Sequence, residues 1–68
     1  MRSITKRVAA RIVELRRERG LSQEEVAEKA RINRVTLARI ERAVNQPTLD
    51  TLDRIARALG ATLVELIK

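Results

Sequence analysis

The sequence has no cysteine, no histidine and no aromatic residue among its 68 positions. Without cysteine no disulfide can form, and without cysteine or histidine the usual ligand sets for zinc, copper and non-haem iron cannot be assembled. The two serines, Ser3 and Ser22, have no imidazole to activate them as nucleophiles. We therefore expect a chain that is not an enzyme, that holds no metal and that carries no cofactor.

Two further absences limit the partners. Phe, Tyr and Trp are the side chains on which single-stranded bases stack, so their absence argues against RNA-binding and single-strand-binding modules of that kind. No apolar stretch approaches the roughly 18 residues that a membrane-spanning helix needs, and the N-terminal segment lacks the long apolar part of a signal peptide. We expect a soluble, cytoplasmic protein that does not enter a membrane.

Basic residues are abundant, since 15 Lys and Arg stand against 9 Asp and Glu, which gives a net charge of +6. The excess lies in two segments. Residues 1–19 carry seven basic and two acidic side chains (+5), and residues 31–42 carry four arginines and one glutamate (+3). Residues 20–30 sum to −2 and residues 43–68 to zero. The pattern indicates an anionic partner for the two basic segments and leaves a neutral, apolar C-terminal third for a protein contact.

Apolar residues recur at three- and four-residue spacing along nearly the whole chain, which predicts an all-α domain over residues 1–68. Five helices are expected, over about 5–19, 22–29, 33–42, 48–59 and 62–67. The residues expected to face the core are Ile4, Val8, Ile12, Leu15, Val26, Ala27, Ala30, Leu37, Ile40, Leu49, Leu52, Ile55, Ala56 and Leu59.

Helix boundaries are marked by capping residues. Capping boxes are expected from Ser22 to Glu25 and from Thr62 to Glu65, and Asn33 is a further plausible N-cap. Thr48 caps the fourth helix after the break at Pro47, and glycines 20 and 60 act as C-terminal stops. The short gap between the second and third helices is typical of a helix-turn-helix rather than of an up-down bundle.

The third helix has an unusual outer face. Leu37 and Ile40 point to the core, and the opposite arc holds Arg34, Val35, Ala38, Arg39 and Arg42 without a carboxylate. A solvated charged face is the simple alternative, but solvated helices usually interleave Glu with Lys or Arg. Guanidinium groups match phosphate oxygens and the guanine edge, and a valine methyl suits the thymine methyl. This face therefore predicts contact with the major groove of duplex DNA.

The chain resembles the lambda-repressor-like (XRE, Cro/cI-type) helix-turn-helix family over about residues 8–67. The resemblance rests on the run LSQEEVAEKA (21–30), Ile32-Asn33-Arg34, Ile40-Glu41-Arg42, Pro47 and the run IARALG (55–60). It implies a compact five-helix DNA-binding domain whose helix-turn-helix is formed by the second and third helices. Within the family, the Asn33-Arg34 opening and the short chain look most like the controller proteins of restriction-modification systems.

The resemblance also implies roles by position. Gln23 would bind a DNA phosphate and brace the third helix. Contacts to base edges would come from Arg34, Val35 and Arg39, with Thr36 at the margin. Contacts to the DNA backbone would come from Arg42 and Asn45.

Two further roles concern the protein itself. Arg16 and Glu41 would form an internal ion pair between the first and third helices. The dimer contact would come from the last two helices through Val64, Leu66 and Ile67, although Val64 and Ile67 also fit an ordinary core or scattered surface positions.

The chain departs from the family pattern at two glycine positions. Arg31 stands in the turn between the second and third helices, where a left-handed backbone would cost about 1–2 kcal/mol relative to glycine. Either that strain is present or the turn differs. Ala43 replaces the glycine after Glu41-Arg42, and Asn45 is expected to take the left-handed position instead.

These observations predict a sequence-specific, double-stranded DNA-binding transcriptional regulator. It would act as a homodimer on an inverted-repeat operator and associate with the nucleoid when bound. One alternative is an antitoxin-type interaction module that neutralises a toxin and regulates its own operon. Another is a basic amphipathic membrane-surface peptide built on the first helix, which the missing aromatic anchors argue against.

Overall fold

The computed structural model describes residues 3–68 and contains five helices: α1 (Ile4–Glu18), α2 (Gln23–Ala30), α3 (Arg34–Glu41), α4 (Leu49–Ala58) and α5 (Leu63–Ile67). Each predicted boundary lies within one residue of the observed one, and no strand occurs within residues 3–68. The all-α fold class is therefore confirmed. Residues 1 and 2, which the predicted domain includes, lie outside the described residues.

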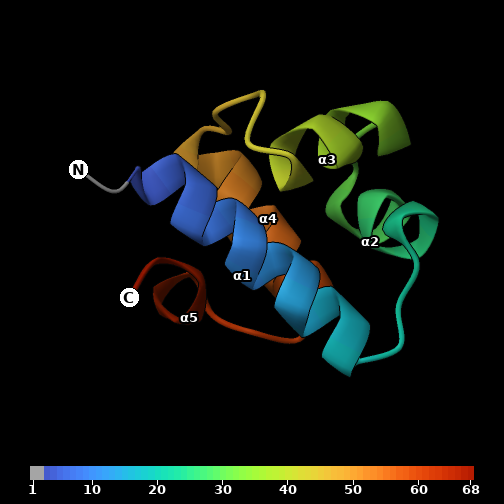
Figure 1. Ribbon diagram of the computed structural model, residues 1–68. Helices are drawn as coiled ribbons and strands as arrows, with labels where there is room; N and C mark the ends of the chain where they lie inside the picture. Colours follow the sequence, from blue (N-terminus) through green and yellow to red (C-terminus); the bar gives the residue numbers. More distant parts are fainter. Residues whose placement is uncertain (1–2) are drawn as a thin grey trace.

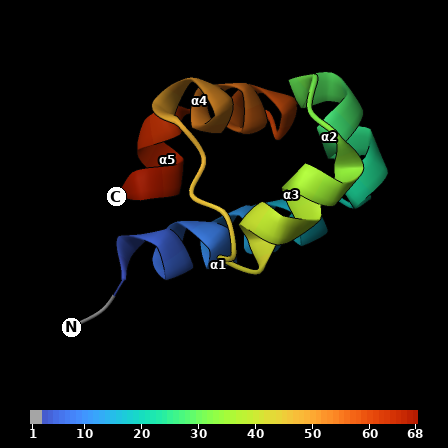
Figure 2. The ribbon, with the colours of Figure 1, turned by 90° about the horizontal axis from the view of Figure 1, so that it is seen from above.

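The helices surround a single core. In Figure 2, α1 and α4 lie on opposite sides, α2 and α3 close one end, and α5 closes the other. Helix α2 packs on α3 and α4, and α5 packs on α1 and α4. The start of α1, the loop between α3 and α4, and the end of α5 therefore gather at the end of the molecule away from α2 (Figure 1).

Every helix begins at a side-chain cap. The Ser22 hydroxyl accepts from the Glu25 N–H at 3.0 Å, and the Glu25 carboxylate accepts from the Ser22 N–H at 2.9 Å. The bond from the Ser22 N–H to the carboxylate is the largest cause of a lowered pKa of Glu25, because it stabilises the charged form. Thr62 and Glu65 form the second predicted box. The N-caps Asn33 and Thr48 are also confirmed, and Ser3 is an additional, unpredicted cap of α1.

The four longer helices end in the same way. Each is followed by a residue with φ between 59° and 73°, namely Gly20, Arg31, Ala43 and Gly60. The next N–H then bonds to a carbonyl five positions back, as when Val44 donates to Arg39 at 2.9 Å and Ile32 to Ala27 at 3.0 Å. This is the Schellman arrangement, in which a left-handed residue ends the helix; Arg31 is itself the C-cap of α2, and the other three residues follow the cap.

Arg31 and Ala43, which stand where the family has glycine, both adopt the left-handed backbone at these helix ends. Arg31 has φ 59°, so the turn keeps the left-handed backbone and Arg31 carries its strain. The expectation for Asn45 was wrong, because Ala43 occupies the left-handed position itself, with φ 60°.

The core consists of aliphatic and alanine side chains from all five helices. Its members are Val8, Ile12, Leu15, Val26, Ala27, Ala30, Leu37, Ile40, Leu52, Ile55, Ala56, Leu59 and Leu66. Two predicted core residues are corrected: Ile4 is 59% exposed and Leu49 is 68% exposed. Both are the first residue of a helix, and that first turn extends beyond the end of the core.

Candidate nucleic-acid interface

The outer face of α3 is open to solvent. Arg34, Arg39 and Arg42 are exposed, Val35 is 50% exposed, and Thr36 is half-buried at the margin. The opposite side of α3 is fixed by Leu37 and Ile40, which are buried in the core. The predicted base-contacting residues thus lie on one surface of one anchored helix, where the guanidinium groups and the valine methyls are available to a ligand.

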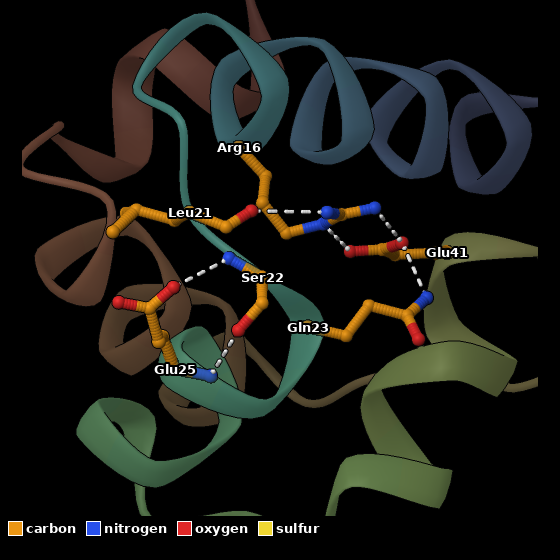
Figure 3. Close-up of polar contacts among 6 residues, drawn as sticks. All are labelled: Arg16, Leu21, Ser22, Gln23, Glu25 and Glu41. Carbon is orange, nitrogen blue, oxygen red and sulfur yellow. Dashed lines mark hydrogen bonds and ion pairs between the residues drawn. The ribbon is translucent and has the colours of Figure 1, made fainter.

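A buried ion pair holds α3 against α1 (Figure 3). Arg16 donates from Nε to Glu41 Oε2 at 2.8 Å and from Nη2 to Glu41 Oε1 at 3.1 Å. Its third nitrogen, Nη1, donates to the Leu21 carbonyl at 3.1 Å. The Arg16 and Glu41 side chains are only 14% and 4% exposed. The ion pair expected from the resemblance is therefore present, and it also ties down the segment that leads into α2.

Gln23 joins the same network from the start of α2. Its Nε2 donates to Glu41 Oε1 at 2.9 Å, so Gln23 braces the end of α3 directly (Figure 3). A primary amide carries two N–H groups, and the second is available for an acceptor outside the network. Gln23 and Arg34 line one open polar hollow between the starts of α2 and α3. The predicted phosphate-binding glutamine thus lies beside the first predicted base-contacting arginine.

A second open polar hollow lies beyond the other end of α3. Asn45 lines it together with Ser3, Lys6 and Gln46, and Gln46 Nε2 donates to the Thr5 hydroxyl at 3.1 Å. Our sequence prediction did not single out Lys6, which is 39 positions from Asn45. Only the basic charge of residues 1–19 pointed toward this segment. The structure adds an exposed lysine to the polar surface that follows α3.

Much of the basic charge on α1 serves the fold. Arg7 Nη2 donates to the Ile67 carbonyl at 2.9 Å, and Arg11 Nε donates to the Glu65 carbonyl at 3.3 Å. Both acceptors are carbonyls at the end of α5, which has no further helical turn to satisfy them. Arg16 is occupied by Glu41. The sequence assigned the basic excess of residues 1–19 to an anionic partner, and the structure shows that Arg7 and Arg11, besides the expected Arg16, make internal bonds.

The predicted dimer residues have different environments. Leu66 is 1% exposed and belongs to the core. The prediction of Leu66 as a dimer contact was therefore wrong, because almost none of its surface is accessible to a partner. Val64 is 61% exposed, and Ile67 is partly buried against the core. Helix α5 is too short to turn all three residues outward while it covers the core.

Two features are absent from residues 3–68. None of the helices there combines the length and the hydrophobicity required to cross a bilayer. No group of three or more acidic side chains in the same range is placed to hold a metal ion.

A family model described as helix-turn-helix matches residues 12–66. The chain belongs to the lambda-repressor-like helix-turn-helix family. This is a family of helix-turn-helix domains rather than of enzymes. Within the lambda-repressor-like domain, α2 and α3 are the two helices of the motif and Arg31 lies in its turn.

Individual relatives agree with this assignment. The chain is 42% identical over 62 residues to the uncharacterized HTH-type transcriptional regulator y4dJ of Sinorhizobium fredii, covering 91% of this chain and 80% of the relative. It is 43% identical over 60 residues to the immunity repressor protein of Bacillus phage phi105, covering 88% of this chain and 42% of that one. The crystal structure of the restriction-modification controller protein C.AhdI from Aeromonas hydrophila superposes with a TM-score of 0.88 at 31% identity, covering 91% and 94% of the two chains.

Proposed function

We propose that this lambda-repressor-like domain is a sequence-specific regulator of transcription that binds double-stranded DNA. The observation that carries the proposal is the exposed surface of α3, where Arg34, Val35 and Arg39 stand free while Glu41 is turned inward and paired. An exposed face of arginine and valine without a carboxylate suits phosphates, guanine edges and thymine methyls. The names of the relatives, a repressor and two regulators of transcription or restriction-modification, support the same function.

The arrangement separates affinity from specificity. Gln23, which lies beside Arg34, and Arg42 with Asn45, which follow α3, contact the phosphates that flank the major groove. Contacts of this kind supply affinity for any duplex and fix the protein on the backbone. Arg34, Val35 and Arg39, with Thr36 at the margin, select the base sequence from the outer face of α3. Lys6 joins the backbone contacts beside Asn45.

The regulator acts as a homodimer on an inverted repeat. A two-fold dimer places its two recognition helices in successive major grooves, about 34 Å apart, and a palindromic operator repeats that symmetry. The likeness to C.AhdI, which extends over nearly the whole of that chain, supports a controller of restriction-modification genes as the regulatory setting.

The decisive experiment is selection of bound duplexes from a random pool. An inverted repeat among the selected sequences is the expected result, and a selection that yields no common sequence would overturn sequence-specific binding. Arg39→Ala should then lower the affinity for the selected duplex by about tenfold or more while leaving that for random DNA within about twofold. Arg57→Ala is the matched control, since Arg57 is an exposed arginine on α4, and its loss should change neither affinity.

A further inference from the structure

An apolar groove lies at the end of the molecule where the start of α1 meets the start of α4 and the end of α5. It encloses about 340 Å³, and its apolar lining includes Ile4, Val8, Ile40, Pro47, Leu49 and Ile67. Within residues 3–68 no charged side chain lines it. On a chain with a net charge of +6, such a neutral concave surface is set apart from the DNA-facing arginines.

Two large aliphatic side chains project at this same end. Leu49 is 68% exposed and Ile4 is 59% exposed, and both also line the groove. Each leaves most of its apolar surface in water, which is unfavourable in proportion to the area exposed. The molecule therefore carries an apolar projection and an apolar hollow side by side on one face.

We infer that a second copy of this chain docks on the groove, and that each copy seats its Leu49 in the groove of the other about a two-fold axis. A two-fold interface uses one patch twice, so that patch must be complementary to itself. A projecting leucine beside an uncharged apolar hollow meets that requirement. The inference rests on the homodimer of the proposed function and specifies where its contact is centred, at the starts of α1 and α4 rather than at Val64.

The position of α3 fits this arrangement. Ile40 lies on the inner side of α3 and contributes to the groove, whereas Val35, Arg39 and Arg42 lie on the outer side. Docking through the groove leaves the DNA-facing side of α3 uncovered in both copies. This docking also brings the C-terminal end of each α3 toward the two-fold axis. The two copies of α3 then lie on either side of that axis.

Helix α5 forms one wall of the groove, and arginines from α1 hold it in place. Ile67 lines the groove, and its carbonyl accepts from Arg7 Nη2 at 2.9 Å. Arg11 Nε donates to the carbonyl of Glu65, two residues earlier, at 3.3 Å. These bonds make the wall part of the folded monomer, so the groove is preformed for the partner.

The test measures the monomer–dimer equilibrium of the full chain by sedimentation. Leu49→Asp should weaken dimerisation by at least about tenfold, because an aspartate in the groove is buried without a partner. Leu49 is already exposed, so the fold should survive, as unchanged helical circular dichroism would confirm. Val64→Asp is the matched control on α5 and should have a smaller effect. A dimer unaffected by Leu49→Asp overturns the inference and leaves the homodimer standing, whereas a wild-type chain that stays monomeric on its selected DNA overturns the homodimer itself.

Cross-linking tests the docking directly, because the chain has no cysteine of its own. A mixture of two single-cysteine proteins, Leu49→Cys and Thr5→Cys, should form a mixed disulfide, since Thr5 lines the groove that receives Leu49. A mixture of Leu49→Cys with Lys29→Cys, an exposed position on α2, is the control and should not. Equal yields in the two mixtures would contradict the docking.

Discussion

Arg16 and Glu41 lie 25 positions apart and meet through two parallel hydrogen bonds in a nearly closed space between α1 and α3. Arg16 Nη1 also donates to the Leu21 carbonyl, and Gln23 Nε2 donates to Glu41 Oε1, so each oxygen of the Glu41 carboxylate accepts from at least one donor. A buried pair of this kind contributes to the orientation of α3 more than to net stability, because desolvation offsets much of the attraction. The surface proposed to contact DNA is thus oriented by a contact that the last residue of the same helix makes with α1.

Breaking this pair from one side should be strongly destabilising. The Glu41 side chain is 4% exposed, and Arg16→Ala leaves Gln23 as its remaining donor. Because the carboxylate then lacks its cationic partner, we expect the free energy of unfolding to fall by about 3 kcal/mol. Urea denaturation followed by far-ultraviolet circular dichroism measures this, since the chain has no aromatic fluorophore. Arg57→Ala, which breaks the exposed pair with Asp53, should change stability by less than about 0.5 kcal/mol. Similar losses in the two variants would contradict the structural role of Arg16.

Introducing glycine at the two left-handed positions that lack it should increase stability, which is the opposite of the effect of Arg16→Ala. Arg31→Gly and Ala43→Gly should each raise the free energy of unfolding by about 1 kcal/mol, because glycine adopts positive φ without the steric penalty of a Cβ. Ala10→Gly, at an exposed position inside α1, should lower it by about 1 kcal/mol. A loss of stability at position 31 or 43 would contradict the strain assigned to that turn.

The capping box of α2 should give the stability a defined pH dependence. The bonds from Ser22 keep the pKa of Glu25 below its ordinary value of 4.5, so the folded state favours the charged carboxylate. The stabilisation is therefore present above pH 4.5 and is lost as the pH falls through the lowered pKa. Glu25→Gln should flatten this part of the curve of unfolding free energy against pH. Glu24→Gln removes the same charge beside the box and should leave the curve unchanged; equal effects of the two variants would assign the dependence to general charge.

Arg42 and Arg39 should differ in their response to salt. Arg42→Ala removes a proposed phosphate contact, so it should weaken binding to the selected duplex and to random DNA alike and reduce the slope of log K against log salt by about one. Arg39→Ala should lower mainly the affinity for the selected duplex. A loss confined to the selected duplex in Arg42→Ala would place that side chain against a base instead.

Local sequence patterns predicted the helices well because caps and periodicity act over a few residues. Ser22 with Glu25, Thr62 with Glu65, and Asn33 each cap the helix that was expected from them. The same periodicity failed at Ile4 and Leu49, because a helical face continues past the end of the core while the packing does not. Periodicity indicates which face of a helix a residue lies on. It does not indicate whether the core extends as far along the helix as that residue.

The contacts of the candidate site depend on residues far apart in the chain. The Arg16–Glu41 pair came from the family resemblance, since nothing within a few positions of either residue indicates the other. The use of Arg7 and Arg11 by α5 was missed for the same reason, because their acceptors lie 60 and 54 positions away. Charge counting assigns such arginines to the surface, and only the folded chain shows that they bind backbone carbonyls.

The bonds from α1 to α5 have a consequence for the order in which the molecule assembles. Closing 60 residues to bring Arg7 to Ile67 loses more chain entropy than forming the turn from α2 to α3, whose contacts span few positions. We expect the helix-turn-helix to form first and the wall of the groove last, so amide hydrogen exchange should be faster in α5 than in α3. The DNA-binding helices would then form before the surface that binds the second copy. A monomer would bind the operator first and dimerise there.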